Sequence, residues 1–330
     1  MKTVENAFWV ISSYFNPMGS NRRLQNYREF RRALNAPLAT VEWVWTKGST
    51  AQLNNDDAEI LRTIAGPDLL WQKERLLNEA IRILPQECKY VAWLDCDVLF
   101  NDPEWMHQVV EALQSHQIVQ PYSICVNLDT NGRPIEPDKL GGKPKHTLAN
   151  PETRNSIPQD ALRHELRGLG VGCGHAWAAR IELLREHGLY DACILGSGDR
   201  AIFSAAIGRS QDASAYMRMN SRRTAHYLEW AIPFHGAVDS RVGWIPGHIH
   251  HLWHGSIIDR RYEQRHSEFV GYAFEPTKHI TKDKCGSWKW CDPNSAMARY
   301  VEEYFRQRNE DGEYLMAVSE DGRTEATQMR

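Results

Sequence analysis

The chain has 330 residues, of which 42% are hydrophobic and 25% charged, and its formal net charge is −3. These values are ordinary for a globular protein with a sizeable core, and the near balance of charge argues against a dedicated polyanion binder. No stretch approaches the apolar length of a membrane span, and the N-terminal apolar run is too short for a secretory signal. Seven cysteines without a C-x-x-C pair favour reduced thiols. The sequence therefore predicts a soluble, cytoplasmic protein.

Strand and helix patterns alternate along the first half of the chain. Apolar, β-branched runs predict strands, and apolar residues at helical spacing between them predict amphipathic helices. The expected ranges are 7–16, 39–45, 90–100 and 118–126 for strands, and 22–34, 68–84 and 103–116 for helices. Alternation of this kind predicts an α/β fold, with a Rossmann-like, mostly parallel central sheet flanked by helices.

The second half of the chain is less regular. A polar segment rich in Gly and Pro, 127–160, predicts a long loop that could act as a lid. A Gly-rich turn then leads into a helix within 170–191, and 217–232 is helical in pattern. "GHIHHLWHGS" (247–256) predicts a last strand. A helical C-terminal extension is expected within 266–310, packed on a main domain of residues 1–265, and a flexible polar tail at 311–330.

Two carboxylates close the third predicted strand, in "VAWLDCDVLFND" (91–102). Because successive side chains of a strand alternate, Asp95 and Asp97 are expected on one side, with Cys96 on the other. In open α/β sheets, ligands bind beyond the carboxyl ends of strands. Paired carboxylates there suit Mg²⁺ or Mn²⁺, which in turn bind diphosphates. The alternative is an exposed acidic loop without a metal.

In these features the chain resembles the GT-A glycosyltransferases, of the nucleotide-diphospho-sugar transferase superfamily, over roughly residues 7–265. In that family such a strand ends in D-x-D, and a preceding helix carries Lys or Arg and Asn. Here "WQKERLLNEAI" (71–81) supplies Lys73 and Asn78, which the resemblance implies are donor-binding. It also implies that Asp95 lies near the ribose and the metal, and that Asp97 is the firmer metal ligand.

Later segments extend the resemblance. In relatives, the acidic residue after a Gly-rich turn lies beside the acceptor hydroxyl, and Asp199 in "GSGDRAIFSAAIG" corresponds to it. Asp199 is therefore expected to be the catalytic base, or alternatively the cap of the helix that follows. Many metal-dependent relatives take a further ligand from a late His, for which His254 is the first candidate and His251 the second. Imidazole favours Mn²⁺ over Mg²⁺; hydrogen-bonded core histidines or a zinc site are the alternatives.

The remaining candidates concern the donor and the sugar. In the GT-A pattern the loop after the first strand holds the base and ribose of the donor. The resemblance therefore implies that Tyr14 stacks on the base and that Asn16 hydrogen-bonds to the donor, although Tyr14 suits the core nearly as well. Arg261 is expected at the diphosphate, unless the local arginines form a solvated helix face. A sugar or acceptor pocket is expected at Gly174, Trp177 and Trp253, and the glycines around Gly174 are equally compatible with a plain tight turn.

The resulting functional prediction is a metal-dependent glycosyltransferase, hexosyltransferase-like, with Mn²⁺ or Mg²⁺ as cofactor. It would move a sugar from a nucleotide-diphosphate donor, UDP before other nucleotides, to an acceptor hydroxyl, with inversion and with Asp199 as base. A retaining mechanism, which needs no such base, is the alternative. The acceptor is left open between a glycan, a small molecule and a modified DNA base. Three alternatives remain: a phage-type enzyme acting on modified DNA bases, a sugar-nucleotide nucleotidyltransferase, and a non-catalytic binding module on the same scaffold.

Overall fold

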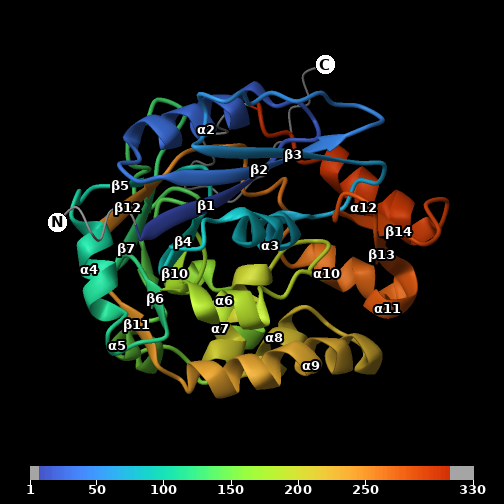
Figure 1. The fold of residues 1–330 in the computed structure, drawn as a ribbon. Coiled ribbons are helices and arrows are strands. Elements are labelled where there is room, and N and C mark those ends of the chain that lie inside the picture. Colours follow the sequence, from blue (N-terminus) through green and yellow to red (C-terminus); the bar gives the residue numbers. More distant parts are fainter. Residues whose placement is uncertain (1–6, 313–330) are drawn as a thin grey trace.

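A seven-stranded sheet forms the centre of the computed structural model, which describes residues 7–312 (Figure 1). The strand order is β11-β6-β10-β4-β1-β2-β3. All of its described strands share one direction except β10, which is antiparallel to both neighbours. Their bounds are Phe8–Phe15 (β1), Leu38–Trp45 (β2), Ile60–Gly66 (β3), Tyr90–Leu94 (β4), Ile118–Gln120 (β6), Ala176–Arg180 (β10) and Val242–Trp244 (β11). The predicted α/β class with a mostly parallel sheet is confirmed.

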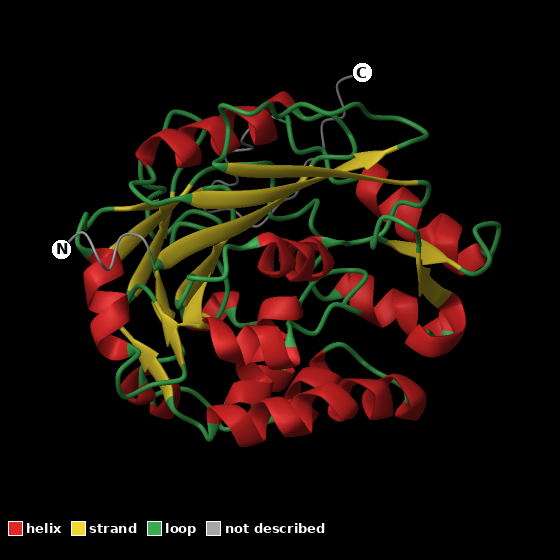
Figure 2. Cartoon of the chain, viewed as in Figure 1, coloured by secondary structure: helices red, strands yellow, loops and turns green. Residues whose placement is uncertain are grey.

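Helices cover both faces of this sheet (Figures 1 and 2). The alternation of strand β1 shows why, because Ile11 and Phe15 enter one apolar cluster with α3, whereas Val10 and Tyr14 enter another with α2. The helices of the central part are α2 (Asn21–Ala33), α3 (Lys73–Ile83), α4 (Trp105–Ala112), α5 (Pro151–Asn155), α6 (Ile181–His187), α7 (Gly198–Ala206), α8 (Ser210–Tyr216) and α9 (Ser221–Val238). None of the described helices is long and apolar enough to cross a membrane.

A second sheet, with the order β5-β12-β7-β8-β9, meets the first at the site described below. Its strands are Val98–Phe100 (β5), Ile124–Asn127 (β7), Lys145–Thr147 (β8), Val171–Gly172 (β9) and His248–His251 (β12). Two strands predicted as continuous are therefore divided between sheets. The range 90–100 breaks at the Asp-Cys-Asp triplet, and 118–126 breaks at Pro121, which has no backbone N–H to donate to a ladder.

Several element boundaries differ from the sequence-based expectation. The helix predicted from residue 68 begins at Lys73, because the Asp68 carboxylate instead accepts a hydrogen bond from Trp290 N. The predicted loop 127–160 contains β8 and α5. Strand β10 was not predicted, since its sequence, Ala-Trp-Ala-Ala-Arg, has little β-branched character.

The C-terminal part is mostly helical, with one short hairpin (Figure 1). Helix α12 packs Phe305 against Phe15 and Trp71, at ring-centroid distances of 5.5 and 6.2 Å, beside the end of β1. The elements are α10 (Gln264–Phe269), α11 (Pro276–His279), β13 (Ile280–Lys282), β14 (Trp288–Trp290) and α12 (Ala296–Arg306). The 3₁₀ turns within residues 7–312 are Ala161–Arg163, Arg167–Leu169 and Val270–Tyr272. Most of the tail predicted at 311–330 lies outside the described residues.

Candidate functional site

A cavity of about 250 Å³ lies beyond the carboxyl ends of β1 and β4. This is where open α/β sheets bind their ligands. The predicted site residues on its wall are Lys73, Asp95, Asp97, Gly174, Asp199, His251 and His254. Residues separated by up to 181 positions in the sequence are thus brought together around one space.

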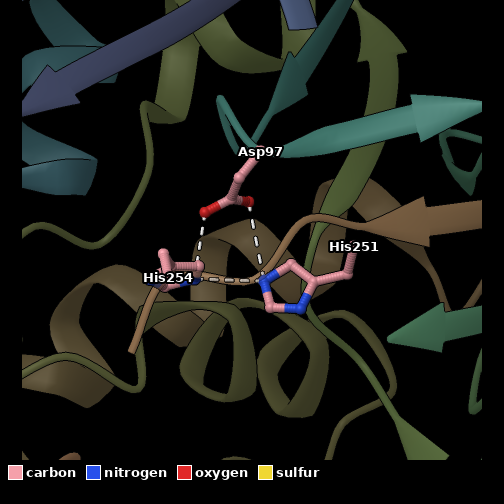
Figure 3. A group of neighbouring side chains, drawn as sticks. All are labelled: Asp97, His251 and His254. Atoms are coloured by element: carbon pink, nitrogen blue, oxygen red, sulfur yellow. Dashed lines mark hydrogen bonds and ion pairs between the residues drawn. The ribbon is translucent and has the colours of Figure 1, made fainter. Parts of the chain in front are cut away.

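Asp97, His251 and His254 converge at one end of the cavity (Figure 3). The Nε2 atom of His254 lies 3.0 Å from Asp97 Oδ2 and 3.1 Å from His251 Nε2, and the latter lies 3.7 Å from Asp97 Oδ1. Ligands about 2.1 Å from a cation lie about 3 Å or slightly more from one another. The three side chains, all buried, therefore have the spacing of a metal-ligand set.

The orientation of His251 is fixed by Asn127 at the end of β7. Asn127 Nδ2 donates to Gly141 O at 2.6 Å, so its Oδ1 must be the acceptor for His251 Nδ1 at 3.0 Å. The proton of His251 is consequently on Nδ1, and the Nε2 lone pair points toward Asp97 and His254. An outer hydrogen bond that fixes the tautomer in this way is usual for histidines that bind metals.

The electrostatics of this group also fit a cation. Asp97 Oδ1 is buried and has no hydrogen-bond partner. Burial, helped by the nearby Asp95 charge, raises the pKa of Asp97 to about 7. Burial also holds the pKa values of His251 and His254 well below the usual range, so both imidazoles are neutral and can act as ligands. A divalent ion would compensate the Asp97 charge and occupy the open valence of its Oδ1.

Asp95 does not belong to this group, contrary to the expectation that both carboxylates share one cation. Its Oδ1 lies 2.6 Å from Lys73 Nζ, which also donates to Asp199 Oδ1 and Oδ2 at 3.1 and 3.0 Å. The reason is the break between the sheets, because Asp95 ends β4 whereas Asp97 leads into β5. The second ligand role therefore falls to a histidine of β12, and Asp95 becomes half of a lysine-bridged pair.

Asp199 lies at the start of α7, and the alternative that it caps this helix is wrong. The cap position is Ser197, which has a left-handed φ of 74° and makes no side-chain cap bond. Asp199 follows in the first turn and extends toward Gly174, where an added Cβ would lie 3.5 Å from Asp199 Oδ2. Burial raises its pKa against the opposing effect of Lys73. A carboxylate that faces a cavity and has a raised pKa has the character of a general base.

Two residues of α10 hold the turn before Asp199. Arg265 Nη2 donates to Ser197 Oγ at 3.0 Å, and His266 Nε2 lies 2.9 Å from the same oxygen. Arg265 also donates to Tyr304 Oη at 2.9 Å, which links α12 to this wall of the cavity. The left-handed Ser197 is thus kept in place by long-range contacts.

Three arginines surround the Asp97 group, and Arg261 is not one of them. Arg23, Arg260 and Arg308 line the cavity, and Arg260 Nη2 lies 3.1 Å from His254 Nδ1. Arg261 instead pairs with Glu268 and lines a different cavity. The prediction of Arg261 was wrong because its backbone, at φ 44°, turns the side chain away directly after Arg260.

Three residues predicted at the ligand are structural. Tyr14 and Trp177 are only 1% and 0% exposed, and neither lines the cavity. Tyr14 packs on Tyr27, and Trp177 stacks on Trp93 and donates to Cys173 O. Asn16 hydrogen-bonds to Tyr14, Ser20 and Gln52, and so shapes the loop after β1. Both faces of the sheet are covered, so an aromatic residue on either face becomes core.

Two further candidates line other cavities. Asn78 binds Leu189 O and Asp191 through Nδ2, and accepts from Leu189 N through Oδ1. Positions five apart on a helix are rotated by about 140°, so Lys73 and Asn78 cannot both face the site. Trp253 lines a smaller neighbouring cavity and carries Arg22 over its ring at 5.4 Å.

One histidine of the site, His175, was not predicted. It follows Gly174, has a left-handed φ of 74°, and places its ring centroid 4.7 Å from that of His251. Its Nδ1 is buried without a hydrogen-bond partner. Burial lowers its pKa well below the usual value. A histidine inside a Gly-rich turn was the available signal, but nothing local related it to the distant β12.

No family model matches the chain, and no curated protein matches it. Among solved structures, it is similar to residues 1–349 of TarS from S. aureus, at 12% identity and a TM-score of 0.37, over 91% of this chain and 71% of that one. It is also similar to glucosyl-3-phosphoglycerate synthase from Mycobacterium tuberculosis, at 12% identity and a TM-score of 0.40, over 87% and 89%. A third is 4-diphosphocytidyl-2C-methyl-D-erythritol synthase from Anaerococcus prevotii, at 11% identity and a TM-score of 0.32, over 73% and 90%. A functional proposal therefore has to rest on the residues of this chain.

Proposed function

We propose that the protein is a GT-A-type glycosyltransferase that moves a sugar from a nucleotide-diphosphate donor to an acceptor hydroxyl. One observation carries this proposal: a metal-ligand set surrounded by arginines faces the same cavity as a lysine-held carboxylate. The first arrangement suits a divalent ion and a diphosphate, and the second suits removal of a proton. All seven cysteines are free, which fits a reducing compartment such as the cytoplasm.

Stabilisation of the leaving diphosphate falls to the side of the cavity that carries Asp97. A cation held by Asp97, His251 and His254 would supply Lewis-acid stabilisation of the diphosphate. Arg23, Arg260 and Arg308 add fixed positive charge around that position. Because the donor set combines two imidazole nitrogens with one carboxylate, we propose Mn²⁺ rather than Mg²⁺, and UDP as the first nucleotide to test.

Proton transfer falls to the opposite side. The acceptor oxygen attacks the anomeric carbon while the bond from that carbon to the diphosphate oxygen breaks, and the electron pair leaves with the diphosphate. The hydroxyl proton passes to the Asp199 carboxylate. Lys73 holds Asp199 and Asp95 in place, and attack from the side opposite the leaving group would invert the anomeric configuration. Asp95 lies next to the same space, within reach of a donor hydroxyl.

The test compares Asp97→Asn with Asp56→Asn, a change at an exposed carboxylate for which no side-chain contact is seen. Titration calorimetry with Mn²⁺, then with UDP and GDP, should show tight, metal-dependent nucleotide binding in the wild type and the control. In Asp97→Asn, metal affinity should fall by roughly 100-fold or more. Slow donor hydrolysis with a panel of UDP- and GDP-sugars should follow the same pattern.

Two results would overturn the proposal. The first is a wild-type protein that binds no nucleoside diphosphate at millimolar Mn²⁺. The second is wild-type donor turnover in folded Asp97→Asn. Formation of a sugar nucleotide from a nucleoside triphosphate and a sugar phosphate would reassign the site to a nucleotidyltransferase.

A further inference from the structure

The last described segment of the chain contacts arginines that line the candidate site. After α12, Glu310 forms a two-point ion pair with Arg23, with Nε–Oε2 and Nη2–Oε1 distances of 2.5 and 2.9 Å. Arg308 Nη2 lies 2.8 Å from Glu310 Oε1. Both arginines line the cavity that contains Asp97 and His254. One carboxylate of the chain thus engages two of the three arginines proposed to bind a diphosphate.

The next residue fills a second anion position. Asp311 accepts hydrogen bonds from Ser20 Oγ at 2.8 Å, and from Asn21 N and Arg22 N at 3.0 and 2.8 Å. These are the cap and the first two residues of α2. The free N–H groups and positive dipole end of a helix N-terminus are a common site for phosphate groups. In this structure they are taken by a carboxylate 290 residues away in sequence.

The same segment also lies against the loop that follows the metal-ligand histidines. A Cβ at Gly255 would lie 3.0 Å from Glu310 Cα and 3.1 Å from Asn309 O. The backbone of this segment therefore passes directly beside His254.

The arginines retain donors that Glu310 does not satisfy. The Nε atoms of Arg308 and Arg260 are buried without a hydrogen-bond partner, and Arg308 is only 8% exposed. A single carboxylate offers two oxygens, whereas a diphosphate offers more oxygens and more negative charge. The pocket of arginines is therefore only partly satisfied by the internal anion. Exchange for a phosphate-bearing ligand would complete it.

We propose that Arg23, Arg308 and the N-terminus of α2 form a phosphate subsite, which Glu310 and Asp311 fill until a nucleoside diphosphate displaces them. The identity of the ligand rests on the proposed function, whereas the displacement itself concerns only an anion and this segment. Binding then moves residues 309–312 away from α2. Affinity for phosphate groups is lowered by the fraction of molecules in which the internal anion is in place.

The test measures the binding of inorganic pyrophosphate, with and without Mn²⁺, to the wild type, Glu310→Gln and Asp311→Asn. Each variant keeps the shape of the side chain and removes its charge. We expect binding to tighten by about 10-fold in Glu310→Gln and by less in Asp311→Asn. The matched control is Glu302→Gln, which removes an exposed carboxylate paired with Arg306 on the same helix; its affinity should equal that of the wild type.

A second measurement needs no variant. Pyrophosphate should speed hydrogen exchange of the Gly312 amide, which donates to Asn309 O within the displaced segment, relative to the core of α12. Folded variants with unchanged or weaker binding, or unchanged exchange at saturating pyrophosphate, would show that Glu310 and Asp311 are a fixed brace. If pyrophosphate displaces the segment but no nucleotide binds and no donor is consumed, the subsite stands and the proposed function fails.

Discussion

The two sides of the cavity handle buried charge in opposite ways. On one side, Lys73 lies between Asp95 and Asp199, so cation and carboxylates compensate one another within the chain. On the other, Asp97 has a buried oxygen without a partner, next to neutral histidines. A buried oxygen without a hydrogen-bond partner is costly, so we infer that a ligand completes it. The charges around Lys73 are therefore compensated without a ligand, whereas the group of Asp97, His251 and His254 has the spacing of a site that a ligand would complete.

Asp199→Asn removes the proposed base next to Lys73 and keeps the shape of the side chain. Because the amide cannot accept the acceptor proton, kcat should fall by roughly 100- to 1,000-fold. The affinity for nucleotide, measured by calorimetry, should change little, since the proposed diphosphate position is beside Asp97, His251 and His254 and not beside Asp199. Asp292→Asn, at an exposed carboxylate that only caps the local turn, is the control. Equal losses of affinity and turnover would contradict the separation of the two sides.

Lys73→Met removes the cation that pairs with Asp95 and Asp199. Two partly exposed carboxylates then lose their shared cation, and because removal of one partner from a fully buried pair costs about 3–5 kcal/mol of unfolding free energy, the loss here should lie below that range. The loss should shrink as the pH falls, because Asp199, whose pKa burial raises, takes up a proton. Urea unfolding at pH 5 and pH 8 measures this. Lys47→Met, at a more exposed pair with Asp68, should cost less than about 1 kcal/mol.

Glu74→Gln tests how a buried carboxyl group beside Lys73 changes the free energy of unfolding with pH. Burial raises the pKa of Glu74 to about 8, against the opposing effect of Lys73. Between the unfolded value of 4.5 and this one, only the folded state binds the proton, so this group lowers stability as the pH rises. The variant should gain a few kcal/mol near pH 8 and nothing near pH 4.5. A gain that does not depend on pH would show that the carboxyl group is not the cause.

Asn78→Ala tests a residue that belongs to neither side. It removes the amide that holds Leu189 N and O, so about 1–3 kcal/mol of stability should be lost. Metal and nucleotide binding should remain at wild-type affinity, because Asn78 lines a different cavity. A selective loss of nucleotide binding would restore the donor-binding role first expected from the sequence.

The sequence predicted what local patterns encode. The Asp-Cys-Asp triplet after an apolar run indicated Asp97, and the resemblance to GT-A enzymes indicated the late histidines, of which His251 ends β12 and His254 follows it. The predicted arginine, Arg261, is one position from Arg260, which lines the cavity. The left-handed backbone of Arg261 directs its side chain elsewhere. Nothing in the sequence pointed to Arg23, because its partner Glu310 is 287 residues distant. Contacts of this range leave no local signature.

The misplaced aromatic residues have a common cause. Tyr14 and Trp177 were expected at a ligand because aromatic rings bind bases and sugars. Helices cover both faces of the central sheet, so burial in the core explains them equally well, and the structure places both in it. Only the relation between the two sheets, which no periodicity reveals, decides which side chains reach the cavity.

The pairing of β5 with β12 has a consequence for how such a centre can change over generations. Val98, directly after Asp97, is the ladder partner of His251. A slip of one residue along that ladder would bring His250 into place and turn its neighbour to the opposite face. Selection on this centre therefore acts on the hydrogen-bond frame of two short strands as much as on the three side chains, and small insertions there should be among the least tolerated in the chain.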